Sequence, residues 1–154
     1  MNLLSNTVTL TLDSEFIQLS KLYDKIASSV DLPYFNWNQE TALEEIRKAE
    51  NLVVAIDGSI RSFITYRNYP DRFEISALGS DPDYLKMGYA QHLLETLKKC
   101  ATAQKKPVWL EVHAENLKAL KLYQSNGFSA VQRRKTYYSD QGDAVVMTWT
   151  DGSA

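Results

Sequence analysis

The sequence predicts a mixed α/β (α+β) fold, with a mainly antiparallel sheet of six to seven strands and helices on both faces. The first observation is the order of periodic segments along the chain, which runs strand, two helices, three strands, helix, strand, helix, two strands. The second is the Asp57-Gly58 dipeptide between two apolar runs, the strongest short signal for a hairpin. The third is the length of 154 residues, which suits a single domain spanning 1–154.

The N-terminal part of the chain predicts one strand and two helices. Residues 7–12 alternate threonine with apolar residues, which is typical of a half-buried strand. Asp13 or Ser14 can then cap a helix. A loop over 31–38 carries three aromatic residues, and a shorter helix over 39–49 follows it. The apolar stripe of the first helix consists of Phe16, Leu19, Tyr23, Ile26 and Val30.

The remaining segments alternate between strand and helix periods. Asp57-Gly58 joins the first two strands of a meander, and Asn126-Gly127 is a typical left-handed helix stop. The helix over 89–103 has Ala90, Leu93, Leu94, Leu97, Cys100 and Ala101 at helical spacing. We expect strands over 52–56, 60–66, 72–80, 108–112, 128–134 and 144–150, and a helix over 116–125.

Composition excludes several classes of function. Seventeen basic and nineteen acidic residues give a net charge of −2, whereas nucleic-acid binding normally shows a basic excess. One cysteine and two histidines allow neither an internal disulfide nor a zinc-type ligand cluster, so we expect no metal. The N-terminus lacks the apolar core of a signal peptide, and no run of about 18 apolar residues occurs. We therefore expect a cytoplasmic protein without a membrane partner.

A glycine turn precedes the helix over 89–103 and can bind an anion. Gly88 allows close backbone approach, and Ala90 is nearly as small. The N–H groups and the dipole at a helix start favour phosphate there. The turn matches neither the G-x-G-x-x-G nor the Walker pattern, which argues against dinucleotide or nucleoside triphosphate binding. Taken alone, the glycine fits equally well the start of any helix, with the nearby lysines as its solvated face.

A carboxylate stands on a strand, where glutamate is depleted. Alternation along 108–113 places Trp109, Glu111 and His113 on one face of the strand. A glutamate beside a bulky tryptophan is costly to bury, which makes Glu111 a candidate general base. Without further signals, the residue fits a solvent-exposed strand end better.

The helix after this strand adds a tyrosine. Asn116 and Tyr123 are seven residues apart and share one helical face, whereas Leu117 and Leu120 are expected in the core. A helical tyrosine is usually a packing residue. Tyr123 becomes a candidate site residue only because Asn116 shares its face and Glu111 lies just upstream.

These stretches together resemble the GNAT superfamily of N-acetyltransferases, in particular the bacterial ribosomal-protein-alanine N-acetyltransferases. The resemblance extends from about residue 75 to residue 147 and is weak before that, apart from Phe35-Asn36-Trp37. The matching motifs are Asp81-Pro82-Asp83-Tyr84, Gly88-Tyr89-Ala90, Trp109-Leu110-Glu111-Val112, Asn116 with Ala119-Leu120-Lys121-Leu122-Tyr123, Asn126-Gly127-Phe128, Arg133-Arg134 and Tyr137-Tyr138.

The resemblance implies a GNAT-like fold and direct transfer of the acetyl group of acetyl-coenzyme A to a primary amine. Glu111 would be the general base and Tyr123 the general acid, and no metal would take part. Leu78, Gly79 and Ser80 would bind the acetyl and pantetheine parts, and Asn116 would hydrogen-bond the cofactor. The pyrophosphate would lie on Lys86, Met87, Gly88, Tyr89, Ala90 and Gln91, and the acceptor channel would be lined by Trp37, Tyr137 and Tyr138.

The expected acceptor is the N-terminal α-amine of a protein or peptide, of the ribosomal-protein type, and the expected enzyme is a monomer or weak dimer. Two alternatives stay open: acetylation of a lysine side chain or small-molecule amine, and a non-catalytic protein that binds an acyl-coenzyme A or a partner. Three departures from the family pattern bear on them. Leu85 stands where the family has Gln or Arg, Gly79-Ser80 replaces a small-then-branched pair, and the closing hairpin carries an extra residue at Lys135 or Thr136.

Overall fold

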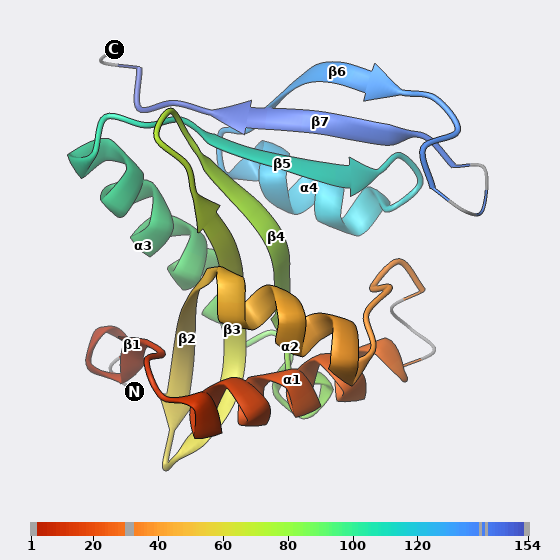
Figure 1. The fold of residues 1–154 in the computed structure, drawn as a ribbon. Helices are drawn as coiled ribbons and strands as arrows, with labels where there is room; N and C mark the ends of the chain where they lie inside the picture. Colours follow the sequence, from red (N-terminus) through yellow and green to blue (C-terminus); the bar gives the residue numbers. More distant parts are fainter. Residues whose placement is uncertain (1–2, 30–32, 139, 141, 153–154) are drawn as a thin grey trace. The chain divides into compact units, whose positions relative to one another are not determined.

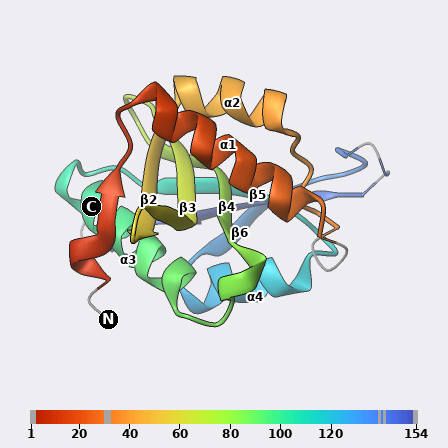
Figure 2. The same ribbon diagram turned by 90° about the horizontal axis from the view of Figure 1, so that it is seen from below.

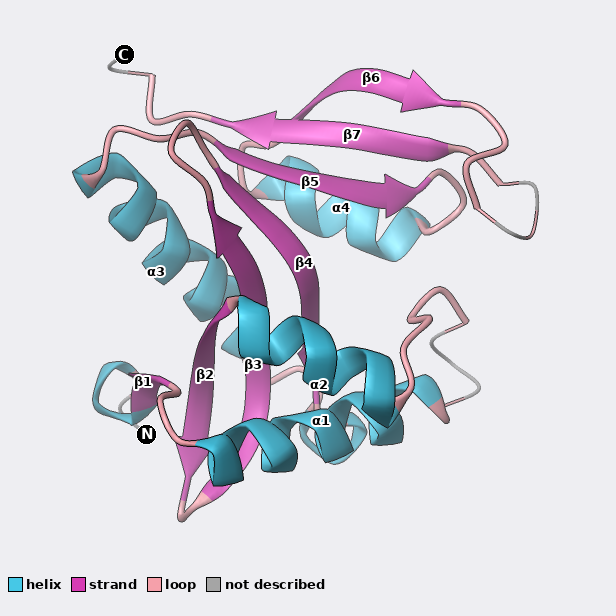
Figure 3. Cartoon of the chain, viewed as in Figure 1, coloured by secondary structure: helices cyan, strands magenta, loops and turns pink. Residues whose placement is uncertain are grey.

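The computed structural model describes residues 3–29, 33–138, 140 and 142–152 (Figure 1). Val30 and the start of the predicted loop over 31–38 lie outside these ranges. The helices are α1 (Asp13–Ala27), α2 (Gln39–Lys48), α3 (Tyr89–Ala103) and α4 (Leu117–Ser125), with short 3-10 turns η1 (Leu4–Asn6) and η2 (Pro82–Tyr84) (Figure 3). The strands are β1 (Thr7–Thr9), β2 (Glu50–Ile56), β3 (Ser59–Asn68), β4 (Phe73–Ser80), β5 (Val108–His113), β6 (Ser129–Arg134) and β7 (Ala144–Trp149).

The strands are hydrogen-bonded in the order β1-β2-β3-β4-β5-β7-β6. β4 pairs with β5 in parallel, whereas β1 with β2, β2 with β3, β5 with β7 and β6 with β7 are antiparallel. The contacts divide the chain into two compact units. The first comprises residues 1–68 and 76–96, and the second comprises residues 69–75 and 97–154. β4 and α3 each contribute residues to both.

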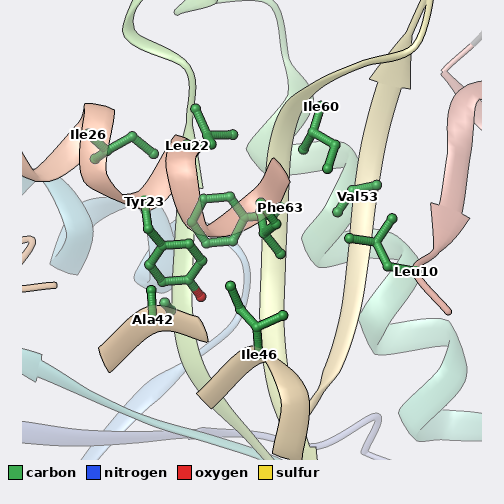
Figure 4. Packing of buried hydrophobic residues seen from close by; sticks show 11 residues of the cluster. Leu10, Leu22, Tyr23, Ile26, Ala42, Ile46, Val53, Ile60 and Phe63 are labelled. Atoms are coloured by element: carbon green, nitrogen blue, oxygen red, sulfur yellow. The ribbon is translucent and has the colours of Figure 1, made fainter. Parts of the chain in front are cut away.

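The first unit is built around an aromatic core. Figure 2 shows α1 and α2 on one face of β2 and β3, and the start of α3 on the other face. The predicted stripe of α1 is confirmed, because Leu19, Tyr23 and Ile26 are buried and Phe16 packs against them. Tyr23 stacks on Phe63 of β3 with ring centroids 4.4 Å apart (Figure 4). These aromatic rings join the α1 helix to the strand that leads towards β4.

A buried chain of polar groups crosses the same core. The Tyr23 hydroxyl donates to Thr65 Oγ1 at 2.5 Å, and Thr65 Oγ1 donates to Asn51 Oδ1 at 2.9 Å. Asn51 Nδ2 then donates to the Ile46 carbonyl at 2.8 Å. Each of these buried polar atoms has a partner within the unit, which is what a buried network requires for stability.

Turn and cap residues explain where elements of the first unit begin. Asp57 and Gly58 adopt φ of 52° and 79°, so the predicted hairpin turn is confirmed. Asn38 caps α2 by accepting from the Thr41 amide at 2.8 Å. The cap predicted at Asp13 or Ser14 is wrong, because α1 already begins at Asp13. Glu15 Oε1 instead accepts from the Leu12 amide at 2.9 Å, which moves the cap position to Leu12.

The second unit contains β5, β7, β6 and α4. Burial alternates along β5 through Val112, as predicted, but His113 is also buried. Gly127 has φ of 88° and ends α4, as expected of a helix stop. Two expected core residues lie at the surface: Leu117 is 72% exposed and Cys100 is exposed. Leu117 opens α4 and Cys100 lies at the edge of its helical stripe, so neither faces the buried side.

Candidate functional site

In the first unit, the predicted phosphate-binding residues Lys86, Met87 and Gly88 form an open turn between η2 and α3. Tyr89, Ala90 and Gln91 are the first residues of α3, and Tyr89 is buried. Lys86 and Gly88 both have left-handed φ, of 62° and 78°. A Cβ added at Gly88 would meet nothing within 4 Å, so the backbone there is accessible. The Gly88 carbonyl accepts from the His92 amide at 3.1 Å and thereby opens α3, whose first N–H groups point out of the helix end. This geometry suits a phosphate.

Ion pairs anchor the segment that leads into this turn. Lys25 Nζ of α1 lies 2.8 Å from Asp81 Oδ1 and 2.7 Å from Asp83 Oδ2. These hydrogen bonds raise the pKa of Lys25 above its ordinary value. Asp81 Oδ1 also accepts from the Asp83 amide at 3.0 Å. The turn therefore starts from a fixed point although its own residues are exposed.

The end of β4 is packed and hydrogen-bonded on the β3 side. Ser62 Oγ donates to the Gly79 carbonyl at 2.9 Å and lies 2.8 Å from Ser80 Oγ. A Cβ on Gly79 would approach Ile26 Cδ1 to 2.9 Å and Phe63 Cζ to 3.0 Å. A side chain at position 79 would require Ile26 or Phe63 to shift, which gives a physical reason for the glycine in this departure from the family pattern.

Trp37 contacts the core of the first unit. Its ring packs edge-on against Tyr23, with centroids 5.4 Å apart and an interplanar angle of 84°. Phe35 contacts the same tyrosine at 5.4 Å. The loop before α2 is therefore held by its aromatic residues, and Trp37 is only partly exposed.

In the second unit, Glu111 lies in a polar hollow of about 180 Å³. Its carboxylate Oε1 is 3.1 Å from Nη1 of Arg134, and the side chain is 22% exposed. Arg72 and Glu74 form a second charge pair at 3.3 Å in the same hollow. The formal charges of these four residues cancel, so the hollow is polar without an excess charge.

Tyr123 has a buried ring and a hydroxyl without a protein partner among the described residues. Its side chain is 8% exposed, and its ring packs edge-on against Phe128 at 5.6 Å. Burial raises the pKa of Tyr123 to about 12, so the phenol stays protonated at neutral pH. Within the described ranges, the hydroxyl has no hydrogen-bond partner. The fully buried side-chain polar atoms without a partner in the described part of the chain are Arg61 Nε, Asn126 Oδ1 and Thr148 Oγ1, so the Tyr123 hydroxyl oxygen reaches the protein surface. It is therefore open to a bound molecule.

Asn116 is the N-cap of α4 rather than its first helical residue. Its Oδ1 accepts from the Ala119 amide at 3.3 Å. A hydrogen bond to a cofactor would therefore come from its amide nitrogen. The capping bond also fixes where α4 begins, and through it the position of Tyr123.

The two hairpin tyrosines have different surroundings. Tyr137 is 50% exposed, and Tyr138 stacks on His113 with centroids 4.9 Å apart. Burial and the Glu111 carboxylate raise the pKa of Tyr138 to about 12. His113 Nε2 in turn lies 2.8 Å from Asp140 Oδ2. Of the two tyrosines, Tyr138 is thus the one whose pKa responds to the Glu111 carboxylate.

Sequence reasoning overlooked the partners of these residues. Arg134 was noted only as part of the hairpin motif, and the pairing of His113 with Asp140 spans 27 residues without a local pattern. In the hairpin, Thr136 has φ of 48° and donates its amide to Asp143 Oδ1 at 2.9 Å, and the pairing of β6 with β7 is irregular between Ala130 and Gln132. Among the described residues, no three His, Cys, Asp or Glu side chains are grouped as metal ligands, and no helix is long and apolar enough to span a membrane.

Comparison with known proteins identifies the family of the chain. The sequence profile of the Acetyltransferase (GNAT) family matches residues 16–128. The [ribosomal protein bS18]-alanine N-acetyltransferase of Salmonella typhimurium is 31% identical over 137 residues, covering 79% of this chain and 93% of the relative. The protein of the same name from Escherichia coli is 30% identical over 121 residues, covering 73% and 80%.

Solved structures agree with the sequence comparison. The crystal structure of the ribosomal-protein-S18-alanine N-acetyltransferase from Escherichia coli matches with a TM-score of 0.80 at 23% identity, covering 96% of each chain. Ard1 from Thermoplasma volcanium matches with a TM-score of 0.74 at 24% identity, covering 94% of this chain and 97% of that one. These matches confirm the GNAT-like mixed fold that the sequence predicts.

Proposed function

Because the chain belongs to the Acetyltransferase (GNAT) family, we propose that it transfers the acetyl group of acetyl-coenzyme A to the N-terminal α-amine of a protein. The observation that carries this proposal is the family match over residues 16–128, which includes the open turn, the strand with Glu111 and the helix with Tyr123. The proposed reaction breaks the thioester and forms an amide, and coenzyme A leaves as the thiol.

In the first unit, the residues fit a coenzyme A phosphate group. Left-handed backbone at Lys86 and Gly88 and the N-terminal end of α3 offer N–H groups to the pyrophosphate. We assign this role to Lys86, Met87, Gly88, Tyr89, Ala90 and Gln91. Backbone groups of Leu78, Gly79 and Ser80 would bind the acetyl and pantetheine parts, and an N–H near Ser80 would stabilise the oxyanion.

In the second unit, Glu111 and Tyr123 would carry the proton transfers. The attacking amine must be neutral, and Glu111 would take its proton directly or through a water molecule. We assign this transfer to Oε2, because Arg134 holds Oε1. Tyr123 would protonate the departing thiolate, for which its pKa of about 12 keeps a proton available. Asn116 would hydrogen-bond the cofactor through its amide nitrogen.

An α-amine is the acceptor that this machinery suits. Its pKa of roughly 7.7–8.0, against about 10.4 for lysine, makes it about 100-fold easier to deprotonate near neutral pH. The relatives named above act on the alanine of a ribosomal protein. Tyr138, whose pKa responds to the Glu111 carboxylate, and the residues Trp37 and Tyr137 would line the acceptor channel. A ribosomal protein as acceptor would place the reaction in the cytoplasm.

A peptide panel tests the proposal. Acetyl-coenzyme A turnover would be measured by mass spectrometry on peptides with varied N-terminal residues, each with its lysines blocked. We expect acetyl transfer to free α-amines, strongest on N-terminal alanine, and none to N-terminally blocked peptides with free lysines. Turnover on polyamines or aminoglycosides but not on peptides would contradict the proposal. Binding of acetyl-coenzyme A without release of coenzyme A on any amine would indicate a non-catalytic protein.

A further inference from the structure

Arg61 of β3 contacts both flanks of the open turn. Its guanidinium carbon lies 4.0 Å from the centroid of the Tyr84 ring, a cation–π distance. Its side chain also forms a hydrogen bond with the side chain of Tyr89. Tyr84 is the last residue of η2 and Tyr89 is the first residue of α3. One arginine on β3 therefore contacts the residue before the turn 85–88 and the residue after it.

The backbone of Arg61 also holds the segment that leads into the turn. Its carbonyl accepts from the Asp81 amide at 2.8 Å, so β3 also holds the point where the segment leaves β4. Asp81 is the residue that Lys25 holds from the other side. Both ends of the segment 81–89 are thus fixed, and the exposed residues 85–88 between them have restricted freedom.

The turn itself lacks a polar side chain at its opening position. Leu85 stands there and is 47% exposed. Arg61 supplies a permanent positive charge nearby, and its hydrogen bond with Tyr89 raises its pKa further. Its Nε atom is buried and, in the part of the chain that the structure describes, has no hydrogen-bond acceptor. The side chain as a whole is only half-buried, so its positive charge can act on an anion bound close by.

We propose that Arg61 is a positioning residue for the pyrophosphate of coenzyme A. Arg61 contacts both Tyr84 and Tyr89, and it supplies the positive charge that Leu85 lacks. The inference rests on the proposed function, in which residues 85–88 lie on the pyrophosphate. It assigns to a strand residue outside the turn a task that the family pattern gives to the turn. Arg61 acts through the turn, so its effect depends on whether the ligand carries phosphates.

A purely structural role for Arg61 makes a different prediction. If the arginine only stabilised the fold, its loss would weaken every ligand alike and lower the melting temperature. If it positions the turn, its loss weakens coenzyme A but spares pantetheine, which lacks the pyrophosphate. The comparison of the two ligands on one variant therefore separates the two roles.

The test uses Arg61→Met, which keeps most of the side-chain length and removes the charge, and Arg61→Lys, which keeps only the charge. Arg47→Met is the matched control, because it changes the formal charge equally at an exposed residue paired with Asp13. Binding of coenzyme A and of pantetheine is measured by calorimetry, with turnover on acetyl-coenzyme A and acetyl-pantetheine. For Arg61→Met we expect about a tenfold rise in Kd and KM for the coenzyme A ligands, typical of losing a charged hydrogen bond.

The other quantities should stay near their wild-type values. We expect kcat at saturation within about twofold, unchanged constants for the pantetheine ligands, an intermediate Kd for Arg61→Lys and wild-type behaviour for Arg47→Met. Equal losses for both ligands, or an unchanged Kd for coenzyme A, would overturn the inference. If wild-type protein bound coenzyme A and Arg61→Met did not differ from it, only the inference would fail. If wild-type protein bound no coenzyme A, the proposed function would fail.

Tyr89→Phe provides a second test that does not remove the arginine. It deletes only the hydroxyl that Arg61 contacts, so we expect a smaller rise in Kd for coenzyme A in the same direction. In the double variant Arg61→Met/Tyr89→Phe, the Tyr89 change should add nothing, because its partner is already gone. Additive effects of the two substitutions on the Kd would contradict the proposed contact between Arg61 and the Tyr89 hydroxyl. Should Arg61→Met fail to fold, the Tyr89→Phe and Arg61→Lys proteins decide the question by the same two-ligand comparison.

Discussion

The two units each bury a tyrosine, and their hydroxyl groups are treated in opposite ways. In the first unit, the Tyr23 hydroxyl donates to Thr65 Oγ1 within a buried chain that ends on the Ile46 carbonyl. In the second unit, the Tyr123 hydroxyl has no hydrogen-bond partner among the described residues. Burial raises the pKa of both phenols, to about 12 for Tyr123.

This difference separates a structural group from a candidate catalytic one. A buried hydroxyl that is paired within the protein stabilises the fold and has little left to offer a ligand. A hydroxyl that has no partner among the described residues and whose oxygen reaches the surface stays available to a ligand. The two tyrosines therefore predict opposite consequences of the same change, the removal of one oxygen atom.

The largest effect is expected for Glu111→Gln in the second unit. The amide cannot take the amine proton, so kcat/KM at pH 6.5 should fall about 10³-fold, within the usual range for a general base. The loss should shrink above pH 8, where the α-amine loses its proton to solvent. Steady-state turnover on an N-terminal alanine peptide at both pH values measures this.

Glu74→Gln is the matched control for this prediction. It removes a carboxylate from the same hollow, where Glu74 pairs with Arg72. We expect it to lower turnover far less than Glu111→Gln does. Full turnover of the Glu111→Gln protein at pH 6.5 would refute the role of Glu111 as the base.

Tyr123→Phe should have the next largest effect. Turnover should fall about 10²-fold, because a general acid is lost. The effect should be smaller than for Glu111, because a thiolate with a pKa near 8.5 needs less help to leave than an amine needs to be deprotonated. Stability should stay nearly unchanged, because the hydroxyl makes no hydrogen bond to a described residue. Turnover and the midpoint of urea unfolding are measured on the same protein; unchanged turnover would remove Tyr123 from the mechanism.

Tyr23→Phe should show the reverse pattern with a smaller effect. Removal of a paired, buried hydroxyl should lower the free energy of unfolding by about 1 kcal/mol, the usual net value of such a hydrogen bond. Turnover should stay at the wild-type level at 25 °C. Urea unfolding gives the first quantity. Lower turnover with unchanged stability would show that the two tyrosines had been assigned the wrong way round.

Local patterns in the sequence predicted most of this fold. Helical spacing and alternation are set by the backbone of each segment, so the core face of α1 and the alternation of β5 were correct. Asp57-Gly58 predicted its hairpin because both residues tolerate left-handed φ. The Asp13 or Ser14 cap was wrong because Glu15 competes for the same helix end. The family and the class of enzyme were also correct, since their motifs are short and contiguous.

Partners between distant residues were not predictable in this way. Arg61 with Tyr84 and Tyr89, Glu111 with Arg134, and His113 with Asp140 all join segments that only the fold brings together. The packing around Gly79 could not be predicted for the same reason, because its neighbours Ile26 and Phe63 come from α1 and β3. The roles of Glu111 and Tyr123 stay predictions until turnover is measured.

The smallest expected effect is the salt dependence of two carboxylate pKa values, one in each unit. The pKa of Asp13 in the first unit is lowered chiefly by the Arg47 side chain, and that of Asp140 in the second unit chiefly by the Gly142 amide. Because both values are lowered, both carboxylates stabilise the fold above pH ~4, and this contribution is lost as the pH falls through their folded pKa values. Added salt screens an exposed ion pair more than a backbone hydrogen bond. Raising the salt concentration to about 0.5 M should therefore move the pKa of Asp13 further towards its ordinary value than the pKa of Asp140. NMR titration at low and high salt measures both pKa values. Equal shifts for the two carboxylates would contradict this assignment.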